Sequence, residues 1–260
     1  MFHQTIMASV AWLVLATVLW AQPGNLPPFV GKYVQKVKFY YTAPNPELGD
    51  ELLQALLQKE NLEHPWLLSN QPVLKILSAQ LGDIAWGHPE ILRKYEAQFE
   101  GASDRGKLLI LEVLSLCGDD KTLSLAEKWS NQKWSEEVQA GVLKLTMALK
   151  TADKPRIFEV PAKQPKDLDL LWANFFITGD YKPVSRILDV FDLPADTKEV
   201  QTLQRVARWS LTSNLKQHPK LLPIIDQHLK ERPAGSRKVL DEIILRFPEK
   251  AIPKDPQQVQ

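Results

Sequence analysis

The sequence predicts an all-α protein built from stacked antiparallel helix pairs, an α-solenoid-like arrangement that forms a right-handed superhelix. From Asn45 to Phe247, apolar residues recur at the three- and four-residue spacing of amphipathic helices. Within that stretch, a helix–turn–helix pattern occurs twice at a constant offset. Because 44% of the 260 residues are hydrophobic and 24% are charged, the chain has enough apolar material to bury a core.

The clearest of the expected helices runs from Asp167 to Ile177. Its apolar residues fill the positions i, i+3, i+4, i+7 and i+8 of one face, namely Leu168, Leu171, Trp172, Phe175 and Phe176. The segment from Lys107 to Cys117 is apolar nearly all round, which predicts a central, buried helix. Further helices are expected over residues 48–57, 73–81, 89–99, 122–129, 135–149, 182–191, 197–216, 219–232 and 236–247.

The internal repeat joins two stretches that align without gaps at an offset of 61 residues, Leu109–Ser124 and Leu170–Ser185. Each contains an apolar helix followed by Gly-Asp-x-Lys-x-(Leu/Val)-Ser. Fainter copies lie near half that offset, at Asp153-Lys-Pro and at Gly87-His-Pro-Glu. The implied unit is two helices in about 31 residues, with glycine ending the first helix and aspartate capping the second. Chance recurrence of a favourable turn is the alternative explanation.

A helix pair of this size resembles the repeats of tetratricopeptide and HEAT proteins. The resemblance covers roughly Asn45 to Phe247 and is architectural, because the tetratricopeptide run Trp-x-x-Leu-Gly-x-x-Tyr is missing. It implies a degenerate helical-repeat protein with an extended concave surface. It transfers no binding residues to this chain.

The first segment has the pattern of an export signal. Residues 6–20 are an uncharged run of 15 residues, shorter than the roughly 20 that a membrane-spanning helix needs. Ala21 follows, and cleavage after it would leave a chain beginning at Gln22. Leu19 is large for the third position before a cleavage site, and residues 1–5 lack Lys and Arg. Retention of residues 1–21 as a membrane anchor is therefore the alternative.

The expected organisation after the signal is a linker or extended arm over 22–44, a repeat domain over 45–247 and a disordered tail over 248–260. Residues 29–41 fit helical spacing and strand alternation equally, so a short helix lying on the body is an alternative to the arm. The chain has one cysteine and no Asn-x-Ser/Thr sequon, which favours a bacterial periplasmic or secreted protein.

Several functional classes are disfavoured. Lys and Arg number 32 against 31 Asp and Glu, so no basic excess suggests nucleic-acid binding. The chain has no Gly-x-Gly fingerprint and no pair of histidines at metal-ligand spacing, so we expect no cofactor and no metal. Cys117 ends an apolar helix and is expected to be structural.

The strongest polar constellation lies near the C-terminus and is the candidate binding patch for a peptide carboxylate or a sugar. Its members are Arg205, Arg208, Trp209, Asn214, Gln217 and His218. The competing interpretation is that Asn214 and Gln217 serve helix ends and that Arg208 pairs with a neighbouring acid. Asn174 is a further candidate, since it is an amide in the most apolar helix; it either pins an adjacent loop or lines a groove.

These observations lead us to expect an exported, non-catalytic protein-interaction or assembly module whose partner is a protein or peptide. Two alternatives stay open at this point. One is an enzyme or small-ligand binder with a dispersed polar site in the concave groove, in which Arg205, Arg208 and His218 act as anchors. The other is a membrane-tethered envelope protein that keeps its N-terminal helix. Contact with a membrane is expected only in that last case.

Overall fold

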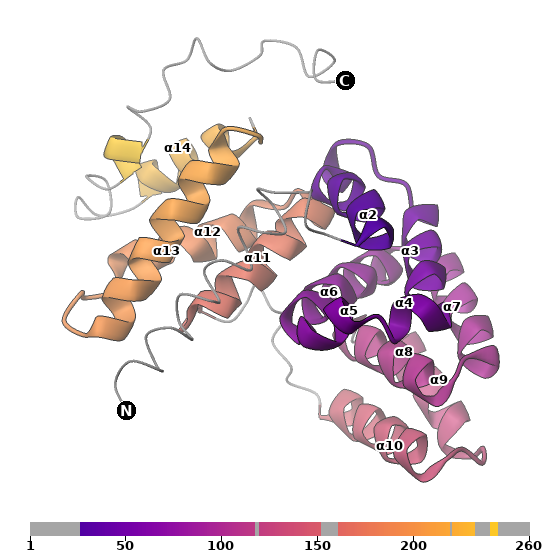
Figure 1. Ribbon diagram of the computed structural model, residues 1–260. Helices are drawn as coiled ribbons and strands as arrows, with labels where there is room; N and C mark the ends of the chain where they lie inside the picture. The colour runs from indigo at the N-terminus through magenta and orange to yellow at the C-terminus, as the bar shows by residue number, and fades with distance from the viewer. Residues whose placement is uncertain (1–26, 118–119, 152–160, 219, 232–239, 244–260) are drawn as a thin grey trace. The chain divides into compact units, whose positions relative to one another are not determined.

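The computed structural model describes residues 27–117, 120–151, 161–218, 220–231 and 240–243. Within these ranges the protein contains thirteen α-helices and two short 3₁₀ helices and no strand, which confirms the all-α fold class (Figure 1). No helix among these residues is long and apolar enough to cross a membrane. The predicted signal segment and the tail beyond residue 247 lie outside the described residues.

The chain divides into two compact units, where the sequence analysis expects one domain over 45–247. The N-terminal unit takes in the described residues up to 151 together with Ala173–Gly179. The C-terminal unit takes in 161–172 and the described residues from Asp180 onward. The boundary falls within one helix, α11, which spans Pro165–Thr178.

The N-terminal unit is a series of helices joined by short turns. Its helices are α2 (Pro28–Lys38), η2 (Tyr40–Thr42), α3 (Glu47–Leu57), α4 (Lys59–Leu62), α5 (Pro65–Ser69), α6 (Gln71–Gly87), α7 (Pro89–Gly101), α8 (Asp104–Cys117), α9 (Asp120–Ser130) and α10 (Glu136–Lys150). The segment left open between arm and helix is therefore helical over α2 and η2. Pro28 suits the first turn of α2, since its fixed φ matches the helix and its missing N–H has no partner there.

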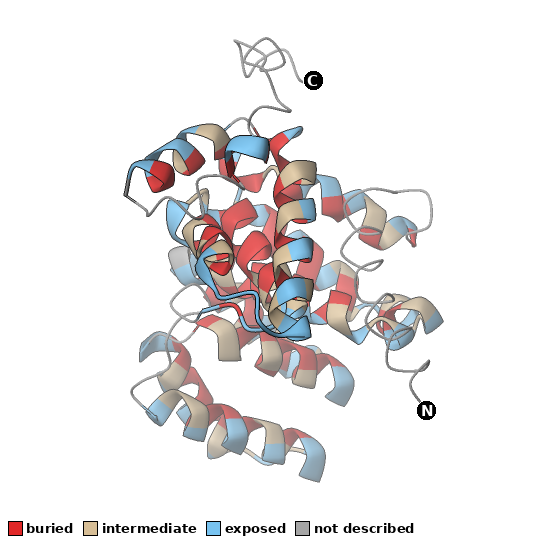
Figure 2. Ribbon diagram, turned by 90° about the vertical axis from the view of Figure 1, so that its left-hand side faces the viewer, coloured by how far each residue is buried: buried red, intermediate tan, exposed pale blue. Residues whose placement is uncertain are grey.

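Helices α6, α8 and α10 pack against one another in sequence, and α7 and α9 pack beside them. The three begin at Gln71, Asp104 and Glu136, so successive starts are 33 and 32 residues apart, close to the repeat length expected from the sequence. Figure 2 shows the buried residues gathered on the inward faces of the helices. One anchor of this core is Phe99, whose ring stacks on that of Trp129 with 3.8 Å between centroids.

Side-chain caps begin several of the helices. Ser103 accepts from Gly106 N–H at 3.2 Å, and Ser135 accepts from Val138 N–H at 3.4 Å.

In the predicted Gly-Asp turn, Gly179 has φ of +63°, and Asp180 accepts from Lys182 N–H at 3.2 Å. The equivalent residues of the earlier repeat, Gly118 and Asp119, and the copy at Asp153 lie outside the described residues.

The C-terminal unit is built around three further helices, α12 (Tyr181–Asp189), α13 (Lys198–Leu215) and α14 (Leu221–Glu231). The short helix η4 (Val190–Asp192) follows α12 and packs on α13, while α14 packs on both α12 and α13. Thr197 caps α13 by accepting from Val200 N–H at 3.3 Å. These contacts hold α13 with one face toward the core and one toward solvent.

The Gly179 turn offers a stability test. A Cβ at position 179 would lie 3.1 Å from Tyr41 Cβ, and the positive φ strains any L side chain. We expect Gly179→Ala to lower the free energy of unfolding by about 1–3 kcal/mol in urea melts. Gly101→Ala is the matched control, because a Cβ there meets nothing within 4 Å; it should change stability by less than about 0.5 kcal/mol. Equal effects of the two substitutions would contradict the strained turn.

Candidate functional site

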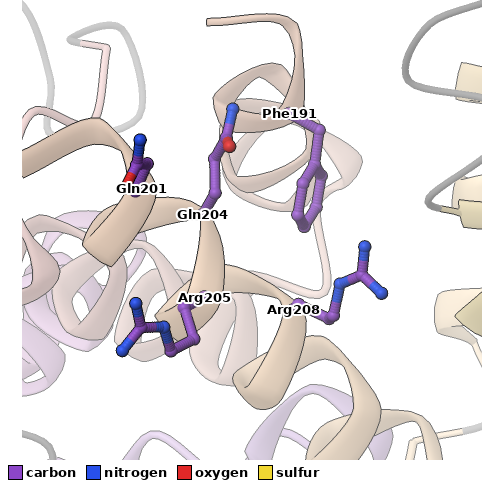
Figure 3. Close-up of a pocket in the computed structure, with 5 residues that line it drawn as sticks. All are labelled: Phe191, Gln201, Gln204, Arg205 and Arg208. Atoms are coloured by element: carbon purple, nitrogen blue, oxygen red, sulfur yellow. The ribbon is translucent and has the colours of Figure 1, made fainter. Parts of the chain in front are cut away.

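A pocket on the C-terminal unit lies between the exposed face of α13 and η4. Its volume is about 300 Å³, and it is lined by Phe191, Gln201, Gln204, Arg205 and Arg208 (Figure 3). The four polar residues recur at the three- and four-residue spacing of one helix face, while the phenylalanine comes from the preceding connector. The site is thus a polar helix face with one aromatic wall.

The two glutamines fix the connector against α13. Gln204 Nε2 donates to Val190 O at 3.2 Å and to Leu193 O at 2.8 Å. Gln201 Nε2 donates to Ala195 O at 2.9 Å. Both amide NH₂ groups are therefore engaged, and no hydrogen bond from the described residues engages either amide oxygen. The pocket consequently has a fixed wall and presents two hydrogen-bond acceptors.

The two arginines differ in what they contact. Arg208 Nη1 lies 2.9 Å from Glu242 Oε2, which confirms the expectation that this arginine pairs with a neighbouring acid. Arg205 is exposed and makes no ion pair with the residues that the structure describes. In Figure 3 the Arg208 side chain extends to the same side as Phe191, whereas the Arg205 guanidinium points away from that ring. Arg205 therefore offers a cationic fork that reaches into solvent.

The rest of the predicted patch does not line this pocket. Trp209 follows Arg205 by one helical turn, and 39% of its surface is exposed. Asn214 is buried in the last turn of α13, and His218 is buried just beyond the helix. Asn214 O accepts the backbone N–H groups of Gln217 and His218 at 3.0 and 2.9 Å, so Asn214 and Gln217 both take part in ending the helix, as the competing interpretation held.

Asn174 belongs to the N-terminal unit, not to the unit that holds the pocket. It is buried, and its Nδ2 donates to Asp83 Oδ2 of α6 at 2.8 Å. Its Oδ1 accepts no hydrogen bond within the described part of the chain. Asn174 therefore pins α11 to another helix, α6, and not to the adjacent loop expected from the sequence.

Spacing along the sequence did not reveal one cluster of possible metal ligands, formed by Asp189, Asp192 and His228. Their donor atoms lie within 4.8 Å of one another, and Ser185 Oγ lies 3.2 Å from His228 Nδ1. The histidine comes from α14, and the aspartates come from the end of α12 and from η4. Because these elements are far apart in the sequence, no local motif indicates the cluster. Arg186 Nη1 lies 3.0 Å from Asp189 Oδ2, which already neutralises that carboxylate. We read this cluster as an ion-pair network that joins α12 to α14.

Burial moves the pKa values of two ionisable groups toward neutral pH. It raises the pKa of the Asp169 carboxyl on α11 to about 7, and it lowers the pKa of the Lys38 ammonium on α2 to about 8. Asp169 makes no hydrogen bond or ion pair with the described residues that would offset this burial. Neither residue lines the α13 pocket, so neither supplies acid–base chemistry there.

No protein-family model, curated protein or solved structure matches this chain. The pocket brings together guanidinium donors, amide acceptors and an aromatic surface, which suits binding. It contains no nucleophile paired with a base.

The raised pKa of Asp169 predicts how stability depends on pH. Between about pH 4 and 7 the folded Asp169 holds a proton that the unfolded chain has released, so its contribution falls as pH rises. We expect Asp169→Asn to stabilise the protein by about 1–3 kcal/mol at pH 8 and by little at pH 4. Urea titrations at the two pH values measure this difference.

Asp167→Asn is the control for that measurement. Asp167 Oδ2 accepts from Lys163 N–H at 2.9 Å and from Gln164 N–H at 3.0 Å, so its charge supports the start of α11. This substitution should destabilise the protein at pH 8, opposite in sign to Asp169→Asn. Destabilisation by both substitutions would contradict the assignment of Asp169 as a carboxyl whose partial burial lowers stability at high pH.

Proposed function

We propose that this chain is an exported, non-catalytic helical-repeat protein of the tetratricopeptide or HEAT type that acts as a protein-interaction or assembly module. The observation that carries the proposal is the α13 pocket, in which Arg205 extends into solvent from a face fixed by Gln201 and Gln204. The 33- and 32-residue spacing of α6, α8 and α10 supports a repeat origin and a right-handed solenoid.

The chemistry of the pocket favours a peptide segment that carries a carboxylate. Arginine donates in a fork that matches a carboxylate. Arg208 already pairs with one carboxylate, that of Glu242, through its Nη1 atom. The glutamine amide oxygens accept backbone N–H groups, and the Phe191 ring covers an apolar side chain. Trp209 extends the same face by one turn beyond Arg205 and adds an exposed aromatic surface.

The rival function, an enzyme or small-ligand binder, would use the same pocket. Its volume of about 300 Å³ is at the lower limit of pockets that enclose small ligands. Five lining residues on one helix face and one connector favour a surface contact over an enclosed reaction site. We therefore place the interaction module first.

Binding is tested by cross-linking the chain in its own envelope fraction and measuring the affinity of the recovered partner. Arg205→Glu should weaken binding by roughly 5- to 20-fold, because it replaces the solvent-facing cation by a like charge for an acidic segment. Arg105→Glu is the control, since Arg105 is an exposed helical arginine of the other unit. If both variants bind as the native chain does, the α13 face is not the interface. If the folded chain recovers no partner, the small-ligand alternative becomes the better one.

Export is tested separately by mass spectrometry of the native N-terminus. Cleavage after Ala21 should give a mature chain that begins at Gln22 and is released without detergent. A chain that keeps residues 1–21 and fractionates with membranes would contradict cleavage and support the tethered alternative.

A further inference from the structure

The outer face of α10 carries an apolar stripe. The helix buries Val138, Val142 and Leu145 on one side, where it packs against α8 and α9. On the other side, Leu143 is 56% exposed and Met147 is 62% exposed, the two highest values for large hydrophobic residues in the described part of the chain. Helix α10 follows α6 and α8 in the packed series and lies at its edge (Figure 1). Terminal helices of stacked repeats normally turn a polar face outward, so this apolar stripe needs an explanation.

The stripe has the spacing of a helix–helix contact. Its five exposed residues are four, three, four and three positions apart, namely Glu136, Ala140, Leu143, Met147 and Lys150. This alternation keeps them on one face, as in the seam of a coiled coil. The three central residues are apolar, and the two ends carry opposite charges. A second helix laid along the stripe would therefore meet an apolar centre between an acidic end and a basic end.

The stripe is complementary to itself. When two copies of α10 run antiparallel about a twofold axis at Leu143, that residue meets its own copy. Ala140 then lies within one residue, a rise of about 1.5 Å, of the position opposite Met147 of the other copy, which places a small side chain near a long one. Glu136 faces Lys150 of the other copy, which places an acid opposite a base. We propose that the outer face of α10 is the contact surface for a second copy of this chain, packed in this antiparallel register.

Two charged neighbours bear on the strength of this contact. Lys150 Nζ lies 2.9 Å from Glu127 Oε1 of its own chain, but both side chains are about half exposed, and an ammonium group has three donors to share. Lys144 is exposed beside the stripe, close to the axis, so its two copies oppose association across one flank. The contact area is on the order of 300–400 Å² per chain, below the roughly 800 Å² of a standard interface. We therefore expect weak, reversible dimers, which form at high local concentration.

This contact uses the N-terminal unit and none of the residues of the α13 pocket, so it does not depend on the proposed partner binding.

The twofold axis allows a direct test of the contact, because a cysteine at position 143 would face its own copy at disulfide distance. The native Cys117 is buried and gives the low background of the unsubstituted chain. The full chain with Leu143→Cys, oxidised at about 100 μM, should yield at least tenfold more covalent dimer than the chain with Leu68→Cys. Leu68 is the control because it is also an exposed leucine of the same unit.

A charge exchange checks the register independently of cysteine chemistry. Glu136→Lys or Lys150→Glu alone places like charges opposite each other and should weaken self-association at least threefold in sedimentation velocity. The double exchange restores opposite charges and should return association to the native level. Equal disulfide yields at positions 143 and 68 would overturn the twofold contact. Single exchanges that leave self-association unchanged would overturn the antiparallel register.

Discussion

The arrangement of the N-terminal unit depends on the close approach of α6 and α8 at Gly82. A Cβ at this position would lie 2.9 Å from Val113 O and 3.1 Å from Leu116 Cβ, so only glycine allows the two helices to touch there. Cys117 Sγ sits in the same contact, 3.3 Å from Gly82 O, which accounts for a buried thiol at the end of α8. Gly141 also lies close to α8, where a Cβ would lie 2.9 Å from a Leu111 methyl, but that methyl is the end of a flexible side chain and can move aside. Helix α8 is therefore held between two neighbours.

This packing decides which surfaces stay open for function. Because α10 contacts α8 through Gly141 and buries Val142 and Leu145, Leu143 and Met147 must face outward. In the C-terminal unit, one side of α13 is buried in the core through Leu203, Ala207 and Leu211. The opposite side therefore faces solvent and carries the pocket residues Gln201, Gln204 and Arg205. Each open surface is the far side of a helix whose near side is fixed by the core. Rigid elements of this kind suit binding, because few side chains must be ordered when a partner arrives.

Helical periodicity made most of the fold predictable. The series of helices, the capping serines and the left-handed Gly179 all follow from apolar spacing and turn chemistry that act over a few residues. The division into two units was not predicted, because α11 runs across the boundary as one continuous amphipathic helix and the sequence marks no break there. The sequence left the segment at Pro28–Lys38 ambiguous, because its apolar residues fit both helical spacing and strand alternation.

The candidate site was predictable only along one helix. Arg205 and Arg208 were found from sequence, and Gln201 and Gln204 could have been, since they continue the same helical face. Phe191 could not, because it reaches the pocket through the fold of the connector. The sequence also grouped Asn214, Gln217 and His218 with the arginines because they are near in the chain. None of the three lines the pocket, and Asn214 O accepts the backbone N–H groups of Gln217 and His218 where α13 ends.

The most direct measurement of the central claim is position-specific photo-cross-linking from the α13 face in the native envelope. In the test variant, p-benzoylphenylalanine replaces Gln201, which lines the pocket. In the control variant, it replaces Lys121, an exposed residue of α9. We expect a discrete adduct with one protein from position 201, none from position 121, and loss of the adduct when Arg205→Glu is added. No adduct from position 201 in the folded chain, or the same adduct from both positions, would contradict partner binding at this face.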